Sequence, residues 1–456
     1  MLLVCLAIGL SACAVRTTVP ASTVPVPETL TDTYTSDAAV ERDWWRQFDD
    51  PVLDRLAAEA LTANRDVHAA AARVAAARAL AGAEGLGHLP SGGVVVGAAR
   101  QHLSAREAGG RDLPSRTGSH LHAGVELAWE ADLFGRLRGR ARAAAADATA
   151  LAMDARAVQV AVAAQVASAY FDYLGAQREA ALVGEMRTRT RALLDRTTTL
   201  VSAGRLTRLD LLRVQQIDED LTGEQSATAH AAERARLRLA TLTGRTGEQW
   251  QVPDTPPRPY RTSRLPIDSA SDAIRRRPDV AAAALRLDAA AARAGVARAE
   301  LFPRIDLTGG VALIAGSVGQ LTDVSAGSWL IAPRLVWSVL DWPRLKRRLR
   351  AAGALTDAAF AEYEQATLRA VEEVQVAVNS YGSATERLRS AERRADASSG
   401  AAAILDIQYR EGLVDSLSRT LAERDAIAGA LAVSRALTEH RQAVVAVYRA
   451  LGGGWR

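Results

Sequence analysis

The sequence predicts a mainly α-helical protein with a membrane β-barrel portion, built from an internally duplicated α-β-β-α-α unit. Three observations lead to this prediction. Residues recur in the same order in both halves, short stretches alternate in polarity (more weakly in the first of the four), and two stretches of about 70 residues carry a helical apolar stripe. Helices of that length have no place in an ordinary globular domain, so they indicate a coiled or tubular assembly.

The duplication is visible as a constant spacing between matching residues. Arg65-Asp66-Val67 matches Pro278-Asp279-Val280 at a spacing of 213 residues, and Trp129, Tyr173 and Gly204 match Trp337, Tyr381 and Gly412 at a spacing of 208. The change of spacing falls between Pro90 and Trp129, so one loop is longer in the first copy. A register kept over about 75 residues indicates two copies of one structural unit.

The N-terminus carries the features of an export signal. The apolar run that opens the chain is too short to span a bilayer. It leads into Leu10-Ser11-Ala12-Cys13, which resembles the lipoprotein signal of bacteria. We therefore expect acyl and diacylglycerol groups on Cys13; the alternative is a leader cleaved elsewhere with an incidental cysteine. The expected segments are a signal peptide (1–12), a lipidated tether (13–43), a first repeat (44–250), a proline-rich linker (251–268) and a second repeat (269–456).

Each repeat contains two predicted strands. Residues 121–130 alternate strictly, with an apolar row that ends at Trp129, and this period is typical of a strand with one apolar face. Trp337 ends the equivalent row, and tryptophan at the end of such a row suits a membrane–water boundary. Pro333 cannot donate a backbone hydrogen bond, which favours an edge strand or an irregularity. Strands are expected at about 92–102, 119–131, 304–314 and 328–337.

Each repeat also contains a long helix that turns back on itself. The predicted helices of about 70 residues would each run roughly 100 Å. They end near Gly204 and Gly412, and return helices reach about Gly244 and Leu451.

Four strands of about ten residues have the length of membrane-crossing strands, but four strands cannot close a barrel. Lipid tolerates no open sheet edge, so we expect several chains to share one barrel. The alternative is a pair of soluble hairpins that cap a coiled coil.

The composition excludes several other classes. The net charge is only +4, and no basic cluster interleaves with aromatic residues, so no nucleic-acid partner is expected. The seven histidines show no metal-ligand spacing, and the cysteines, Cys5 and Cys13, both lie at the extreme N-terminus. There is no phosphate-binding loop and no nucleophile motif. We therefore predict no enzyme activity, no catalytic residue, no metal and no cofactor beyond the covalent lipid.

The ordered motifs resemble the TolC/OprM-type outer-membrane efflux proteins, of the lipoprotein branch called NodT-type. The resemblance spans essentially the whole mature chain. It is carried by Trp44-Trp45 to Leu53, Trp129 to Leu137, Arg276-Arg277-Pro278-Asp279-Val280, Leu301-Phe302-Pro303 with Leu307-Thr308-Gly309, and the terminal Ala450-Leu451-Gly452-Gly453-Gly454-Trp455. It implies a homotrimer with a shared twelve-strand barrel in the bacterial outer membrane and a periplasmic α-barrel of long coiled helices.

The resemblance also implies a function. The trimer would be the passive exit duct of a tripartite efflux pump, and would conduct drugs, metals or other small molecules. Its partners would be a periplasmic adaptor, an inner-membrane pump of the resistance–nodulation–division type and outer-membrane lipid. The alternatives are the outer-membrane component of a type I protein-secretion system, or a periplasmic coiled-coil lipoprotein scaffold that forms no channel.

The resemblance places the functional residues at the two helix turns. Gly204, Arg205, Leu206, Gly412, Leu413 and Val414 would contact the adaptor, and Asp210, Tyr409 and Asp415 would form the periplasmic gate. Simpler roles stay open: each glycine is also a natural helix C-cap, and Asp415 a natural N-cap. Ser418 and Leu421 stand where TolC carries its acidic ring. The side chains expected to face the barrel lumen are His122, Glu126, Glu130, Arg304, Asp306 and Arg334.

Overall fold

The computed structural model describes residues 24–25, 35–36, 43–104, 106, 116–248, 250–253, 265–266 and 270–453. The predicted signal peptide and Cys13 lie outside the described residues. The chain divides into two compact units, here called the sheet unit and the helical unit. The sheet unit includes Arg73–Leu151 and Ala282–Tyr363, and the helical unit consists of Thr23–Ala72, Ala152–Ala281 and Glu364–Arg456.

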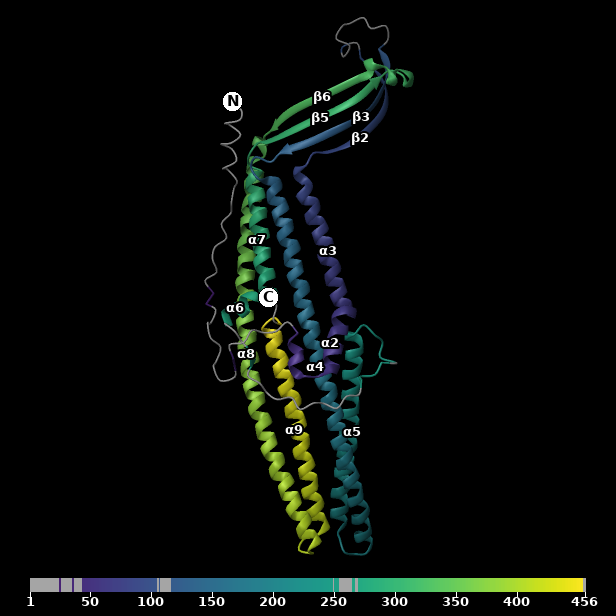
Figure 1. Cartoon of the computed structure of the whole chain (residues 1–456), viewed down its shortest axis with the longest axis vertical. Helices are drawn as coiled ribbons and strands as arrows, with labels where there is room; N and C mark the ends of the chain where they lie inside the picture. The colour runs from purple at the N-terminus through teal and green to yellow at the C-terminus, as the bar shows by residue number, and fades with distance from the viewer. Residues whose placement is uncertain are drawn as a thin grey trace. The chain divides into compact units, whose positions relative to one another are not determined.

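The order of elements repeats between the halves, which confirms the duplicated α-β-β-α-α unit (Figure 1). The first half contains the 3₁₀ helix η2 (Trp44–Phe48), α2 (Pro51–Ala63), α3 (Arg65–Gly85), the 3₁₀ helix η3 (Leu86–His88), β2 (Ser91–His102), β3 (Thr117–Ala131), α4 (Arg136–Ser202) and α5 (Arg208–Leu242). The second half contains α6 (Ala270–Arg276), α7 (Pro278–Ala299), β5 (Arg304–Ala315), two 3₁₀ turns (Val318–Thr322 and Val324–Ala326), β6 (Gly327–Val336), a third 3₁₀ turn (Val339–Asp341), α8 (Trp342–Arg410) and α9 (Ser416–Ala450). A short parallel pair joins β1 (Thr35–Ser36) to β4 (Leu265–Pro266).

The sheet unit holds one antiparallel sheet in the order β2-β3-β5-β6 (Figure 1). Directly opposed residues of antiparallel strands share a face. Val125 lies opposite Val311, and Val311 lies opposite Trp329, so these three belong to one apolar face. On the other face Asp306 lies between Glu130 and Arg334. The two repeats therefore contribute to one sheet with a continuous apolar face and a polar face.

The tryptophans that end the two apolar rows make the same hydrogen bond. The indole nitrogen of Trp129 donates to the carbonyl oxygen of His88 at 2.8 Å, and that of Trp337 donates to Leu301 at 3.1 Å. Both acceptors lie just before the first strand of their own repeat. The indole thus presents its ring to the apolar face while its polar atom is satisfied. Pro333 lies in β6, an outer strand of this chain's sheet, as its missing donor indicated.

One hydrophobic cluster of the helical unit joins three helices. Leu182, Val183 and Met186 of α4 pack with Leu221 of α5 and with the α9 residues Ile427 and Leu431. Such spacings place one side of each helix inward. The two hairpins, α4–α5 and α8–α9, are therefore held together through α4 and α9.

The N-terminal tryptophan motif fastens its segment to helices α4 and α9. Trp44 stacks on Tyr448 of α9, with ring centroids 5.1 Å apart. Asp50 caps α2 by accepting the backbone N–H of Val52 at 2.9 Å, and it also accepts the Tyr170 hydroxyl at 2.8 Å. Burial, together with the hydrogen bond to Asp50, raises the pKa of Tyr170. The motif is thus a clamp between the start of the repeat and helices α4 and α9.

Arg277, which directly precedes α7, likewise connects its segment to other helices, here α8 and α9. Its guanidinium, 7% exposed, contacts Glu373 at 2.7 Å and donates to the carbonyl oxygen of Ala450 at 2.7 Å. That carbonyl ends α9, where the last carbonyls of a helix lack internal partners. A Cβ at Gly452 would lie 3.3 Å from the Cα of Arg277. The φ of Gly452 is +77°, so this position needs glycine.

Candidate functional site

The two hairpin turns are built by the same local rules. Gly204 and Gly412 have φ values of +69° and +74°, a left-handed conformation that glycine adopts at low cost. The next residue then closes the turn: the N–H of Arg205 donates to Leu200, and the N–H of Leu413 donates to Gln408, each at 2.8 Å. Both glycines are therefore helix C-caps.

The return helices begin with equivalent caps of different chemistry. Thr207 caps α5 and forms a reciprocal capping box with Asp210, whereas Asp415 caps α9 and accepts the N–H of Ser418 at 2.7 Å. Hydrogen bonds from Thr207 lower the pKa of Asp210, and those from Ser418 lower the pKa of Asp415. Within one chain both carboxylates thus stay ionised as caps; a ring of three Asp415 side chains remains a prediction.

Exposed apolar side chains gather at the same turns. Leu413 is 74% exposed at the second turn, and Leu209 and Leu212 of α5 are more than half exposed beside the first. Arg205 is exposed, while Leu206 and Val414 are half-buried. Exposed leucines at the end of a hairpin offer contact area to a partner. The residues predicted to contact the adaptor therefore lie at the two turns, and the contact itself stays a prediction.

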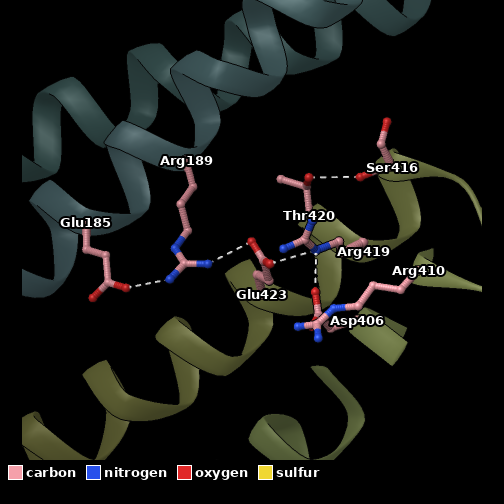
Figure 2. A network of polar contacts seen from close by, with 8 residues as sticks. All are labelled: Glu185, Arg189, Asp406, Arg410, Ser416, Arg419, Thr420 and Glu423. Atoms are coloured by element: carbon pink, nitrogen blue, oxygen red, sulfur yellow. Dashed lines mark hydrogen bonds and ion pairs between the residues drawn. The ribbon is translucent and has the colours of Figure 1, made fainter. Parts of the chain in front are cut away.

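A network of charged side chains lies behind the second turn (Figure 2). The Arg419 guanidinium of α9 contacts Asp406 of α8 at 2.8 Å and Glu423 at 3.0 Å. It also lies over the Tyr409 ring, 5.1 Å from the centroid, in cation–π geometry. Arg410 pairs with the same Asp406. The predicted gate residue Tyr409 is thus held by Arg419, inside its own hairpin.

The same network crosses to the other hairpin. Arg189 of α4 donates to Glu423 of α9 at 2.7 Å and to Glu185 at 2.8 Å (Figure 2). Arg435 of α9 makes a second crossing: it contacts Glu179 of α4 at 3.1 Å and Glu224 of α5 at 2.5 Å. The hairpins are therefore joined by ion pairs as well as by the apolar core.

Sequence reasoning did not identify this network. The pairs Asp406/Arg410 and Arg419/Glu423 have the i,i+4 spacing that favours contact on a helix, and that spacing was the available signal. The crossing from Arg189 to Glu423 joins residues 234 apart in the chain, so no local pattern points to it.

The polar face of the sheet brings together several residues predicted to line the lumen. Asp306 contacts Arg304 at 2.9 Å and Arg334 at 3.7 Å, and Glu130 pairs with Arg136. His122 and Glu126 lie on the same face by register. Among the described residues, no group of three or more metal-ligating side chains occurs.

Comparison with known proteins places this architecture in a family. The family model for outer membrane efflux proteins matches residues 56–245 and 270–453, one match for each repeat.

The chain belongs to the outer membrane efflux protein family.

Curated relatives of this efflux protein match along nearly its whole length. The outer membrane protein OprJ of Pseudomonas aeruginosa is 30% identical over 99% of this chain and 95% of its own. The toluene efflux pump outer membrane protein TtgF of Pseudomonas putida is 28% identical over 91% of this chain and 86% of its own.

Solved structures agree. The outer-membrane channel OprN superposes with a TM-score of 0.87 at 34% identity, covering 97% of this chain and all of that one. The open state of the MtrE outer membrane channel of Neisseria gonorrhoeae gives 0.83 at 26% identity, covering 97% of this chain and 98% of that one. The efflux protein is therefore an outer-membrane channel component with a periplasmic helical extension, and not an enzyme. It serves as the exit duct of a tripartite pump.

Proposed function

We propose that three copies of this chain close one twelve-strand barrel and one tube of helices, which together form a passive path for small molecules across the outer membrane. The proposal rests on the outer edges of the two outer strands of the sheet, which are unpaired among the described residues. In the described part of the chain, β2 and β6 each pair with one strand only. A lipid-embedded sheet must satisfy every backbone donor and acceptor, so neighbouring copies must supply the missing partners.

The exposed apolar face supports a lipid environment for this sheet. Val94, Val311, Trp329 and Ile331 come from three strands, and each is more than 60% exposed. Together they form one continuous apolar surface, which is unfavourable in water and favourable in hydrocarbon. A soluble hairpin pair that caps a coiled coil has no need of such a face.

The hairpin turns are the proposed docking and gating end. The exposed Leu413 and its neighbours would receive the periplasmic adaptor, and Asp210, Tyr409 and Asp415 would restrict the closed path. The inner-membrane partner would be a pump of the resistance–nodulation–division type. A lipid on Cys13 would add a second membrane anchor. Drugs and metal ions are the proposed cargo classes.

The oligomer is tested on purified protein in mild detergent. A shared barrel should run as an oligomer on denaturing gels until the sample is heated, and should conduct ions in a planar bilayer. The stoichiometry follows from mass photometry, which should give three chains per particle. A stable single chain in mild detergent would refute the shared barrel.

The gate role of Asp415 can be separated from its capping role. Asp415→Asn keeps an N-cap acceptor but removes the charge, whereas Asp415→Ala removes both. If the carboxylates restrict the path by charge, both variants should raise the conductance of closed channels. If conductance increases in the alanine variant alone, the role of Asp415 is helix capping. If conductance is unchanged in both variants, Asp415 is not a gate residue. The equivalent cap Thr207 offers the control Thr207→Ala, which disturbs a cap without altering charge.

A further inference from the structure

The two strand-to-helix junctions of the duplicated unit carry the same cations in a different electrostatic setting. Arg136, Arg138, Arg140 and Arg142 at the start of α4 are matched, at the spacing of 208, by Arg344, Lys346, Arg348 and Arg350 at the start of α8. Cations in the first turns of a helix oppose its dipole, so their recurrence is not explained by helix stability.

In the first copy, acidic residues pair with the first two of these cations. Glu130 pairs with Arg136, and Asp132 accepts from Arg138 at 3.2 Å. In the second copy the positions of those two acids are occupied by Ser338 and Leu340. Asp341 contacts Arg344 alone, at 2.8 Å. Among the described residues, Lys346, Arg347, Arg348 and Arg350 have no ion-pair partner.

The residue that replaces the acid is an exposed leucine. Leu340 is 99% exposed, and Trp337 and Trp342 lie on either side of it in the chain, half and two-fifths exposed. The two indole rings lie 6.5 Å apart, and the Lys346 ammonium lies 5.5 Å from the centre of the Trp342 ring. Exposed tryptophan beside basic side chains is the composition of a membrane–water interface.

The cations and the aromatic ring lie on one side of α8. Residues four and eight positions after Trp342 return to nearly the same helical face, and these are Lys346 and Arg350. Both are exposed, whereas Leu345 is buried. The indole of Trp342, the ammonium of Lys346 and the guanidinium of Arg350 therefore follow one another along α8, starting where the apolar face of the sheet ends.

We propose that this junction, formed by Trp337, Leu340, Trp342, Lys346 and Arg350, binds the headgroup phosphate of an anionic phospholipid in the periplasm-facing leaflet of the outer membrane. Leu340 and the indoles enter the acyl boundary, and the two cations contact the phosphate. The leaflet follows from the chain, because α8 belongs to the periplasmic extension and starts at this end of β6. The inference rests on the proposed barrel.

The sequence supplies a direct probe, because Lys346 is the only lysine in the chain. Reductive methylation with ¹³C keeps the positive charge and gives one side-chain amine resonance. The oligomer is placed in nanodiscs of phosphatidylcholine alone or of an equal mixture with phosphatidylglycerol. We expect the Lys346 resonance to shift with the anionic lipid and to lose the shift in high salt.

The duplication provides the matched control. In the double variant Lys346→Arg/Arg138→Lys, the single lysine moves to the equivalent position of the first copy, where Asp132 is its partner. Its resonance should not depend on the lipid. If the resonance responds equally at both positions, the effect is general membrane charge and the site is refuted. If inorganic phosphate added to detergent-solubilised protein gives the same shift, the site binds free anions, and the lipid assignment is refuted.

A second readout counts lipids on the intact oligomer. Native mass spectrometry should show phosphatidylglycerol retained in preference to phosphatidylcholine. Lys346→Gln and Arg350→Gln should each lower this preference about five-fold, the factor that corresponds to about 1 kcal/mol for one basic residue near an anionic surface. An intact, conducting oligomer without lipid preference overturns this site alone. A chain that forms no oligomer overturns the shared barrel instead.

Discussion

Reversing the charge of either partner in the Arg189–Glu423 contact should open the periplasmic end of the channel. The contact joins α4 to α9 across the two hairpins at 2.7 Å (Figure 2). In Arg189→Glu the new carboxylate would face Glu423 and Glu185, so attraction becomes repulsion. Arg189→Glu/Glu423→Arg restores an ion pair in the opposite sense, but it also places the new guanidinium beside Arg419 and the new carboxylate beside Glu185, so the expected recovery is partial.

The magnitude follows from exposure and geometry. The two side chains are 42% and 20% exposed, so solvent screens the pair and its contribution stays within the range of surface ion pairs. The short distance places it at the upper end, about 1 kcal/mol in each chain. If three copies release together, the closed state loses about 3 kcal/mol, on the order of a hundred-fold in the ratio of closed to open channels.

The assay is single-channel recording in planar bilayers, with open probability as the readout. Each single reversal should raise it, and the swapped double variant should bring it back toward the parent. The control is Arg387–Glu439, an ion pair at 3.0 Å within the α8–α9 hairpin whose swap should change nothing. Open probability that is the same in parent and single reversals, or that the swap fails to restore, would show that this contact does not hold the closed state.

Three further predictions concern stability, and each is measured by thermal unfolding of the oligomer in detergent. Burial lowers the pKa of His440 to about 4, so its contribution to stability is present above pH 6.5 and is lost as the pH falls toward 4. Between pH 7 and 5 the loss should be about 2 kcal/mol and should be absent in His440→Gln; equal pH dependence in both proteins would contradict it. Arg277→Lys should cost about 2 kcal/mol because lysine lacks the planar fork that reaches both Glu373 and the end of α9, and an unchanged midpoint would remove that role. Gly412→Ala should cost about 1 kcal/mol because φ is positive there, whereas Gly400→Ala inside α8 should be neutral or stabilising; the reverse order would refute the cap.

Much of the fold was predictable because its signals are local. The alternation that ends at Trp129 and Trp337 has the period of a strand, and the register places both rows on one face. Gly204 and Gly412 mark helix ends because only glycine takes a left-handed conformation cheaply. The constant spacing between the repeats then predicted that the second half would follow the first.

The charged network could not be predicted in the same way. The contact between Arg189 and Glu423 depends on how two hairpins pack, and packing leaves no periodic trace in the sequence. Asp415 illustrates a different limit. It was predicted as a gate residue, with an N-cap as the alternative; one chain shows the capping bond, whereas a ring requires three chains, so the gate stays a prediction.

The pairing of β3 with β5 has a consequence for the order of folding. β2 and β3 are neighbours in sequence, as are β5 and β6, so each β-hairpin forms through local contacts. Trp129 lies opposite Leu307, however, and the whole α4–α5 hairpin is synthesised between them. Closing so long a loop is slow, because its entropy must be lost before the contacts compensate for it. We therefore expect the α4–α5 hairpin to form before β3 meets β5, so that the four-stranded sheet is completed late in folding.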